Sequence, residues 1–180
     1  AGEAFDKVAS MLGLSYPGGP SIQRAAERGN AEAYDFPRAF IRDNDILDFS
    51  FSGLKTAVRY QLTGPGGADF SSLTIPENKV VDIAASFQAA VVDCVVAKSI
   101  LALEKTGHGR LCVGGGVAAN AVLRKALSRE ADQGNWELIT APLSHCTDNA
   151  VMGAIAVEKL RDGIVESLYL DIRPGLVRKK

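Results

Sequence analysis

A glycine-rich segment in the second half of the sequence could bind a phosphate group. Gly114-Gly115-Gly116 follows the apolar run 110–113 and precedes a helical pattern. Backbone N–H groups at a strand-to-helix turn, together with the helix dipole, can hold an anion. The turn meets the loose dinucleotide-binding pattern, but the acidic residue expected at the end of the next strand is missing. A tight corner that needs small residues explains the glycines equally well, and Asn120 in the first helical turn favours a ligand.

A carboxylate later in the sequence has two interpretations. Asp148 lies in Cys146-Thr147-Asp148-Asn149, which opens the last helical pattern. Taken alone, Thr and Asp at a helix start are most often caps that complement the helix dipole. A carboxylate that points into a cleft at the end of a strand can instead ligate a metal or act as a general base. His145 and Cys146 do not indicate a zinc cluster, because adjacent residues at a helix start cannot all turn toward one ion.

Two motifs in the first third of the sequence have weaker chemical interpretations. Asp6, in the first helical pattern, could be a solvated charge. The pair Gly18-Gly19, which two prolines flank, forms a turn or lets a ligand approach the backbone closely. Segment 48–56 reads as a packed strand and then a helix capped by Ser52, with weak support for a phosphate or nucleic-acid role of Lys55.

Apolar periodicity predicts the elements that must position these groups. Helices are predicted up to Gly13 and at 21–28, 53–62, 77–105, 118–131 and 147–160, and strands at 48–52, 110–113 and 136–140. The helix at 77–105 is apolar nearly all round, which is typical of a buried central helix. Alternation of strand and helix after it predicts a parallel sheet. The Gly/Pro/Ser loop 63–76 divides a helical, substrate-side region at 1–75 from a C-terminal α/β lobe at 76–180.

Composition and charge exclude several classes of protein. The 180 residues include 20 Lys and Arg against 21 Asp and Glu, a net charge of −1, and 47% are hydrophobic. These values exclude a disordered chain, a collagen-like repeat and a disulfide scaffold, and they argue against an autonomous nucleic-acid binder. Three cysteines without C-x-x-C spacing favour a reduced, cytoplasmic compartment. Asp82, Asp93 and Lys98 interrupt the long apolar helix, so we expect no membrane span.

Five motifs occur together in an order that is typical of one protein family. They read GEAFDKVA, YPGGP, DFSFSGLKT, GGGVAAN and CTDNAVMGA, and they carry a likeness that extends from Gly2 to about Pro174. In these motifs the sequence resembles the bacterial branch of the tRNA N6-adenosine threonylcarbamoyltransferase family, formerly called glycoprotease or O-sialoglycoprotein endopeptidase. The resemblance implies a two-lobed α/β fold of the actin/sugar-kinase/Hsp70 (ASKHA) type. Because family members are longer and the first helix lacks a cap, we expect this chain to be the C-terminal half of a longer protein.

The resemblance implies an acyl transfer by the full-length protein. Threonylcarbamoyl-adenylate gives its threonylcarbamoyl group to N6 of the adenosine beside the anticodon in tRNAs that read ANN codons. Asp6, Gly19 and Asn120 would contact substrate, and the turn Gly114-Gly115-Gly116 would face the adenylate phosphate. Asp148 would be catalytic and a ligand of one divalent metal, iron in family descriptions and zinc as the alternative. A paralogous non-catalytic subunit and a small ATPase are the family's protein partners.

Two features of the sequence depart from the family pattern. The H-x-x-x-H pair that supplies the other metal ligands belongs to the N-terminal half, and neither His108 nor His145 lies in such a motif. Gln23 stands where some relatives carry an acidic residue, which removes the carboxylate expected to contact a ribose. We therefore expect this fragment alone to be inactive.

Two other functions remain open. A sugar- or acyl-kinase relative of the same fold would need a catalytic Asp and a phosphate loop from an N-terminal lobe. A non-catalytic docking lobe would form a complex without binding nucleotide or metal. The older protease interpretation has no support, because no Ser or Cys in the sequence is set beside a His with an acidic partner.

Overall fold

One long helix organises the part of the chain that carries the motifs. The computed structural model describes residues 1–64, 74–165, 167 and 169. The chain divides into two compact units, Ala1–Thr147 and Asp148–Lys180. In the first unit the apolar run from Glu77 forms helix α4 (Glu77–Thr106), which ends at Gly107 in the left-handed conformation. This confirms the buried central helix that the sequence predicts, since most residues of its first two-thirds are buried.

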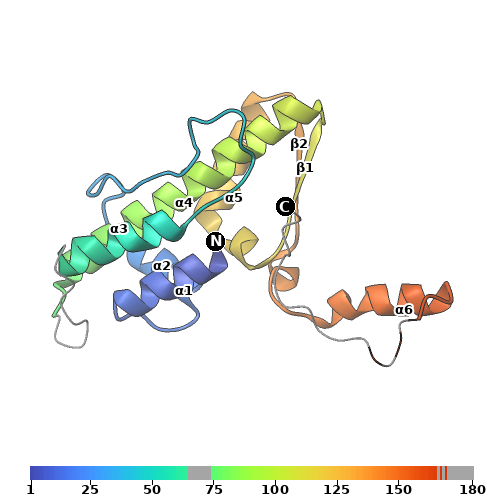
Figure 1. Cartoon of the computed structure of the whole chain (residues 1–180), viewed down its shortest axis with the longest axis horizontal. Helices are drawn as coiled ribbons and strands as arrows, with labels where there is room; N and C mark the ends of the chain where they lie inside the picture. Colours follow the sequence, from blue (N-terminus) through green and yellow to red (C-terminus); the bar gives the residue numbers. More distant parts are fainter. Residues whose placement is uncertain (65–73, 166, 168, 170–180) are drawn as a thin grey trace. The chain divides into compact units, whose positions relative to one another are not determined.

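Three helices from the start of the chain pack around the first half of α4 (Figure 1). They are α1 (Gly2–Met11), α2 (Gly18–Ala26) and α3 (Ser52–Thr63). Phe5 of α1 meets Phe87 of α4 edge to face, with ring centroids 5.2 Å apart, and Ile22 and Val58 are fully buried beside them. Burial of such side chains contributes about 1.5–3 kcal/mol each, so this shared core fixes α1 and α2, which carry Asp6 and Gly19.

A two-stranded parallel sheet lies near the second half of α4 (Figure 1). Strands β1 (Arg110–Val113) and β2 (Glu137–Thr140) pair in register from Arg110 opposite Glu137 to Val113 opposite Thr140, and α5 (Ala121–Gln133) is the crossover between them. Leu123 and Leu127 of α5 pack with Val92 of α4, and the inner face of the sheet covers this second core. The strands predicted at 110–113 and 136–140 and their parallel pairing are confirmed.

Helix α2 begins earlier than the periodicity predicts. The sequence predicts a turn over the Gly-Gly pair and a helix from Ser21, but α2 starts at Gly18. The Asp6 carboxylate supplies the reason, because its Oδ1 accepts the N–H of Gly18 at 2.8 Å and so caps α2 from outside. Pro20 fits inside the first turn because the N–H groups there have no partner within the helix.

The strand predicted at 48–52 is wrong. Residues 47–51 have no regular secondary structure, and no strand among the described residues pairs with them. Phe49 and Phe51 instead stack on one another, with ring centroids 6.2 Å apart and planes 10° apart. Alternating polarity is necessary for a half-buried strand but does not supply a neighbour. Ser52 is the first residue of α3 rather than its cap, and its Oγ lies 3.2 Å from the Ser50 Oγ.

Two predicted helix starts are also wrong. A 3₁₀ helix, η2 (Gly116–Ala119), follows the glycine turn, and α5 begins at Ala121 rather than at residue 118. In the second unit the 3₁₀ helix η4 (Ala150–Gly153) precedes α6 (Ala154–Arg161), so residues 147–149 lie before any helix. A third 3₁₀ helix, η3 (Leu143–His145), follows β2. Tight turns of this kind carry no apolar periodicity, which is why the sequence pattern merges them with the helices that follow.

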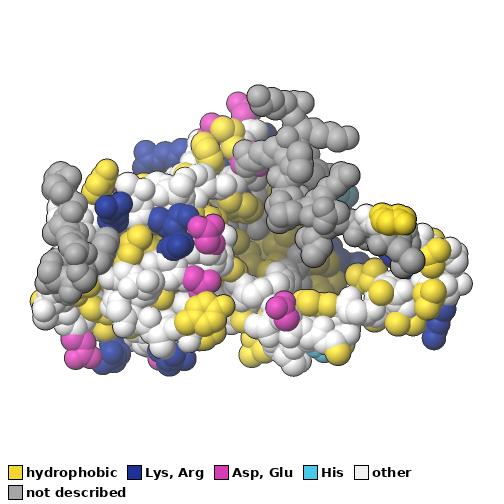
Figure 2. Space-filling view, turned by 60° about the horizontal axis from the view of Figure 1, so that its bottom comes forward, with side chains coloured by type: hydrophobic (Ala, Val, Ile, Leu, Met, Phe, Trp, Pro, Cys, Tyr) yellow, Lys and Arg dark blue, Asp and Glu magenta, His cyan; other side chains and the backbone are white. Residues whose placement is uncertain are grey.

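Two predictions concern the organisation of the chain: the boundary at the loop 63–76 and the nature of the long apolar helix. Most of the predicted loop 63–76, namely 65–73, and the end of the chain at 170–180 lie outside the described residues. The proposed boundary between residues 75 and 76 stays a prediction. Helix α4 is long and apolar enough to cross a membrane by length and composition alone, but 61% of its most apolar window is buried in the molecule, as in a soluble core helix. The face in Figure 2 carries Lys and Arg beside Asp and Glu side chains.

Candidate functional site

Three of the residues expected to contact substrate line one cavity of the first unit. The cavity measures about 520 Å³ and brings together Asp6 of α1, Gly19 of α2 and Asn120 before α5. Its other lining residues are Gly2, Phe5, Pro17, Pro20, Gln23, Gly116, Val117, Ala119 and Thr147. These residues come from segments more than a hundred positions apart in the sequence. The volume falls within the range of small-molecule sites.

The α1/α2 side of this cavity keeps polar capacity for a ligand. Asp6 uses Oδ1 to accept the Gly18 N–H, and a carboxylate has further lone pairs on its second oxygen. A Cβ at Gly18 would lie 2.5 Å from the Cα of Asp6, so glycine there permits the close approach of α1 and α2. A Cβ at Gly19 would meet no atom within 4 Å. Gly19 therefore faces open space, where a ligand can reach the backbone.

The α5 side of the cavity uses its polar groups inside the protein. Asn120 Oδ1 accepts the Leu123 N–H at 2.9 Å and caps α5, while its Nδ2 donates to Gln88 Oε1 at 2.7 Å. Both Asn120 and Gln88 are buried. Gln23 lines the cavity and accepts the Ala121 N–H through Oε1 at 2.8 Å. Of the first four N–H groups of α5, those of Ala121 and Leu123 are bonded to these two side chains and that of Arg124 to the Asn120 carbonyl, so this helix end is not an open anion site.

The three glycines of the turn have different roles. Only Gly115 has a positive φ, +86° with ψ 172°, a conformation that is open in practice to glycine alone. Added Cβ atoms at Gly114 and Gly116 would make ordinary contacts at 3.9 Å. Gly116 lines the cavity, whereas Gly114 and Gly115 do not. A tight corner is therefore the main role of Gly115, and a phosphate contact stays a prediction for the turn as a whole.

Sequence reasoning missed Arg124, which joins the glycine turn to the segment after β2. Its guanidinium donates to the carbonyls of Ala118 and Ala141, both at 2.5 Å, and to Thr140 Oγ1 at 3.1 Å. The Cys146 Sγ lies 3.1 Å from its Nη2. No signal in the sequence pointed to this role, because the helix predicted from residue 118 puts Arg124 in its second turn, and only the observed start at Ala121 puts it in the first.

Comparison with known proteins identifies the family to which this chain belongs. Residues 1–155 match the family described as tRNA N6-adenosine threonylcarbamoyltransferase. The chain is 52% identical to the protein of that name from Rhodopirellula baltica, over 99% of this chain and 52% of that protein. It is 48% identical to the one from Rhodospirillum rubrum, over 97% of this chain and 48% of that protein. The one from Thermotoga neapolitana is 45% identical, over 98% and 51% respectively.

This chain belongs to the tRNA N6-adenosine threonylcarbamoyltransferase family. It spans about half the length of the curated relatives that it matches. The mixed α/β architecture with a small parallel sheet agrees with the fold class that the sequence predicts. Each of the five motifs quoted above lies wholly or mostly within the matched residues.

The expected metal ligand of the family motif lies in the second unit. Asp148 is exposed and precedes the 3₁₀ helix η4, whose cap is Asn149, because Asn149 Oδ1 accepts the Val151 N–H at 3.0 Å. The capping role that the sequence suggests for Asp148 therefore belongs to its neighbour. Within the described ranges no group of three His, Cys, Asp or Glu side chains could hold a metal ion. Catalytic zinc and non-haem iron sites use about three protein ligands, so these residues alone do not fit either ion.

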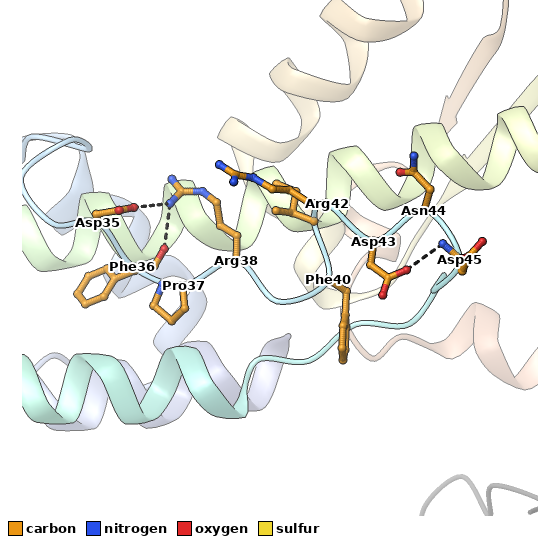
Figure 3. A pocket seen from close by; sticks show the side chains of 10 residues that line it. Asp35, Phe36, Pro37, Arg38, Phe40, Arg42, Asp43, Asn44 and Asp45 are labelled. Atoms are coloured by element: carbon orange, nitrogen blue, oxygen red, sulfur yellow. Dashed lines mark hydrogen bonds and ion pairs between the residues drawn. The ribbon is translucent and has the colours of Figure 1, made fainter.

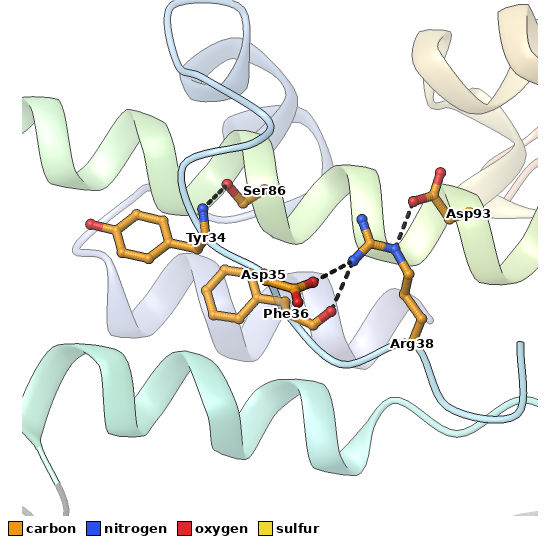
Figure 4. A network of polar contacts seen from close by, with 6 residues as sticks. All are labelled: Tyr34, Asp35, Phe36, Arg38, Ser86 and Asp93. Atoms are coloured by element: carbon orange, nitrogen blue, oxygen red, sulfur yellow. Dashed lines mark hydrogen bonds and ion pairs between the residues drawn. The ribbon is translucent and has the colours of Figure 1, made fainter.

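A second, larger hollow of about 900 Å³ contains no residue of the family motifs. All its lining residues belong to one continuous loop, 35–45, which runs alongside α4 (Figure 3). Hydrogen bonds tie this loop to α4 (Figure 4): the Tyr34 N–H donates to Ser86 Oγ at 3.2 Å, and Arg38 Nε donates to Asp93 Oδ2 at 2.7 Å. Since the fold brings no distant segments together there, we do not assign the substrate to this hollow.

Proposed function

We propose that the full-length protein transfers a threonylcarbamoyl group from threonylcarbamoyl-adenylate to N6 of an adenosine in tRNA, the one beside the anticodon in tRNAs that read ANN codons. Family membership supports tRNA modification. The observation that carries the proposal is the convergence of Asp6, Gly19 and Asn120 on one cavity of about 520 Å³. A cavity of this size accommodates a nucleotide-sized ligand.

The proposed reaction needs a positioned donor and a departing nucleotide. The adenosine N6 attacks the carbamoyl carbon, a new N–C bond forms, the C–O bond to the phosphate breaks, and N6 loses a proton as AMP leaves. In this chain the free Asp6 oxygen would accept hydrogen bonds from hydroxyl or ammonium groups of the donor. Gly19 would let the donor lie against the backbone of α2, and Gly116 would lie nearest the phosphate. Holding the donor in this way lowers the entropic part of the barrier.

The remaining parts of the proposal concern groups outside this chain. Asp148 is proposed as one ligand of a divalent metal, iron or zinc, and as a catalytic residue, with the other ligands supplied from beyond this sequence. The ASKHA arrangement of two lobes, a cytoplasmic location, and a paralogous subunit and small ATPase as partners are proposed on the same family basis. The fragment alone, which lacks the rest of the site, is expected to be inactive.

The charge of Asp6 provides the test of this function. In the full-length protein Asp6→Asn should lower the initial rate of threonylcarbamoyl transfer to tRNA by about tenfold or more, while the melting temperature stays close to that of the parent. Asparagine keeps an oxygen that accepts the Gly18 N–H, so the cap on α2 survives and only the charge is lost. The rate is measured by mass spectrometry of nucleosides from modified tRNA, with the exposed Asp132→Asn as the matched control.

Two results would contradict the proposal. One is a parent protein that leaves tRNA unmodified and phosphorylates a sugar or an acyl substrate, which would favour the kinase alternative. The other is stable complex formation with no binding of AMP by calorimetry, which would favour a docking lobe. A parental transfer rate in Asp6→Asn would show that the Asp6 carboxylate does not hold the donor in this cavity.

A further inference from the structure

Arg124 connects two segments of the chain, η2 and the end of β2 with the loop that follows it. It is the fourth residue of α5 and is half-buried. Its donors reach Ala118 in η2, Thr140 at the end of β2, and Ala141 in the loop that follows. A guanidinium presents five N–H donors in a rigid plane, so one side chain can satisfy acceptors on several sides. The ammonium of a lysine cannot reproduce this arrangement.

The loop 141–147 packs against the glycine turn at this point. A Cβ added to Gly114 would lie 3.9 Å from the Ala141 Cβ, and one added to Gly116 would lie 3.9 Å from the Cys146 carbonyl oxygen. Cys146 is 1% exposed, and its thiol lies 3.4 Å from the Pro142 carbonyl oxygen and 3.1 Å from the Arg124 guanidinium. The loop is therefore folded around a buried thiol that Arg124 holds from one side.

Both segments held by Arg124 end in the wall of the cavity. Gly116, Val117 and Ala119 of η2 line it on one side of the guanidinium contact, and Thr147 lines it at the end of the loop. Arg124 itself is absent from the lining. In the sequence, Asp148 follows Thr147 directly. A change at Arg124 can thus reach the cavity only by moving η2 or the loop.

We propose that Arg124 is a positioning residue that fixes the loop 141–147 against the glycine turn and thereby places the Thr147 side of the cavity for the transfer reaction. The kinetic part of this inference rests on the proposed function, and the structural part does not. Asp6 and Gly19, which the proposed function places against the donor, lie on α1 and α2 and are not held by Arg124, so loss of Arg124 should affect turnover more than binding. Misplacement of a wall by about 1 Å is enough to lower a rate by about a hundredfold.

The kinetic test uses the full-length protein with Arg124→Met, which keeps length and loses the donors. We expect kcat for transfer to tRNA to fall by about tenfold to a hundredfold, while the Kd for AMP changes by less than about threefold. A merely destabilising change would instead lower the number of AMP sites and kcat by the same factor, so calorimetric stoichiometry separates the two. Arg129→Met is the control, because Arg129 lies on the same helix and its guanidinium contacts the neighbouring Glu130 at 3.2 Å.

A second measurement does not depend on the reaction. The rate at which a thiol reagent labels Cys146, read by peptide mass spectrometry, should rise at least about tenfold in Arg124→Met and stay parental in Arg129→Met, because the loop loses its restraint. Arg124→Lys, which keeps the charge, should give an intermediate labelling rate and serves if the methionine variant does not fold. Parental labelling of Cys146, or a parental kcat, in both Arg124→Met and Arg124→Lys would overturn the inference. If the parent itself transfers nothing to tRNA, the proposed function fails while the labelling rates still decide the role of Arg124.

Discussion

The α1/α2 wall of the cavity differs from the η2/α5 wall in what its polar groups do. On the α1/α2 wall, one carboxylate oxygen of Asp6 accepts the Gly18 N–H, and Gly19 faces open space. On the η2/α5 wall, Asn120 Oδ1 accepts the Leu123 N–H and its Nδ2 donates to buried Gln88, while the Ala121 N–H donates to Gln23, which reaches across from α2. Both walls carry family motifs, yet only the first leaves its polar capacity largely unused by the protein.

This difference shows that a motif residue at a cavity can stabilise the cavity wall rather than contact the ligand. A buried amide whose oxygen and nitrogen both have protein partners is costly to remove, whatever binds nearby. Substitution of a glycine that faces open space should change stability little, so its effect is expected in ligand binding instead. Substitutions on the α1/α2 wall, apart from its packing glycine Gly18, should therefore affect binding, and substitution of the capping amide Asn120 on the η2/α5 wall should affect stability.

The largest effect is expected from the two adjacent glycines of α2. In the full-length protein Gly18→Ala should lower the free energy of unfolding by about 3 kcal/mol, because its methyl group would overlap the backbone of α1 at Asp6. Gly19→Ala should change stability by less than about 0.5 kcal/mol, since open space surrounds its Cβ. Urea denaturation measures both. AMP titration should show the reverse order, with Gly19→Ala binding several-fold more weakly than the parent.

Equal stability of the two glycine variants would break this part of the comparison. It would mean that α1 and α2 can separate without cost, and the close approach at Gly18 would then not fix the position of Asp6. Parental AMP binding in Gly19→Ala would instead show that the nucleotide does not lie against α2.

The buried amide pair should give the next largest effect. Asn120→Ala removes a helix cap, worth about 1 kcal/mol, and leaves the Gln88 oxygen without its donor, so we expect a loss of roughly 2–3 kcal/mol in total. AMP binding should weaken by no more than about tenfold, the value of one neutral hydrogen bond from the remaining Asn120 N–H. Gln88→Leu should cost about 1 kcal/mol less in the Asn120→Ala background than in the parent. A strictly additive double variant would show that the pair does not act as a unit.

The sequence predicted the regular elements better than the turns between them. Helix α4 is long and buried over most of its first two-thirds, and the two strands alternate exposed with partly buried residues, so the local pattern of each predicts it. The start of α2 depends on the Asp6 carboxylate, twelve positions earlier than Gly18, and local periodicity contains no such information. The false strand at 48–52 had the right alternation, but only the fold could show that no described strand lies beside it.

The candidate site shows the same division between local and distant information. The motifs supplied Asp6, Gly19 and Asn120, which the structure brings to one cavity, while the metal role of Asp148 is still a prediction. The sequence could not supply Gln88 or Arg124, because their partners lie 32 positions away in one case and up to 22 in the other. Residues that hold a wall in place are recognised by what they touch, and a one-dimensional pattern does not contain that contact.

The smallest effects should separate the glycines of the turn from one another. Gly115→Ala should lower the free energy of unfolding of the full-length protein by about 1 kcal/mol, because a φ of +86° strains any residue with a Cβ, and it should bind AMP as the parent does. Gly116→Ala should leave stability unchanged, since its Cβ would meet only the Cys146 carbonyl oxygen at 3.9 Å, but it should weaken AMP binding several-fold because Gly116 lines the cavity. Thermal unfolding and calorimetry on the same two samples measure both quantities. If Gly115→Ala weakens AMP binding while Gly116→Ala does not, the phosphate lies at the middle of the turn rather than at Gly116.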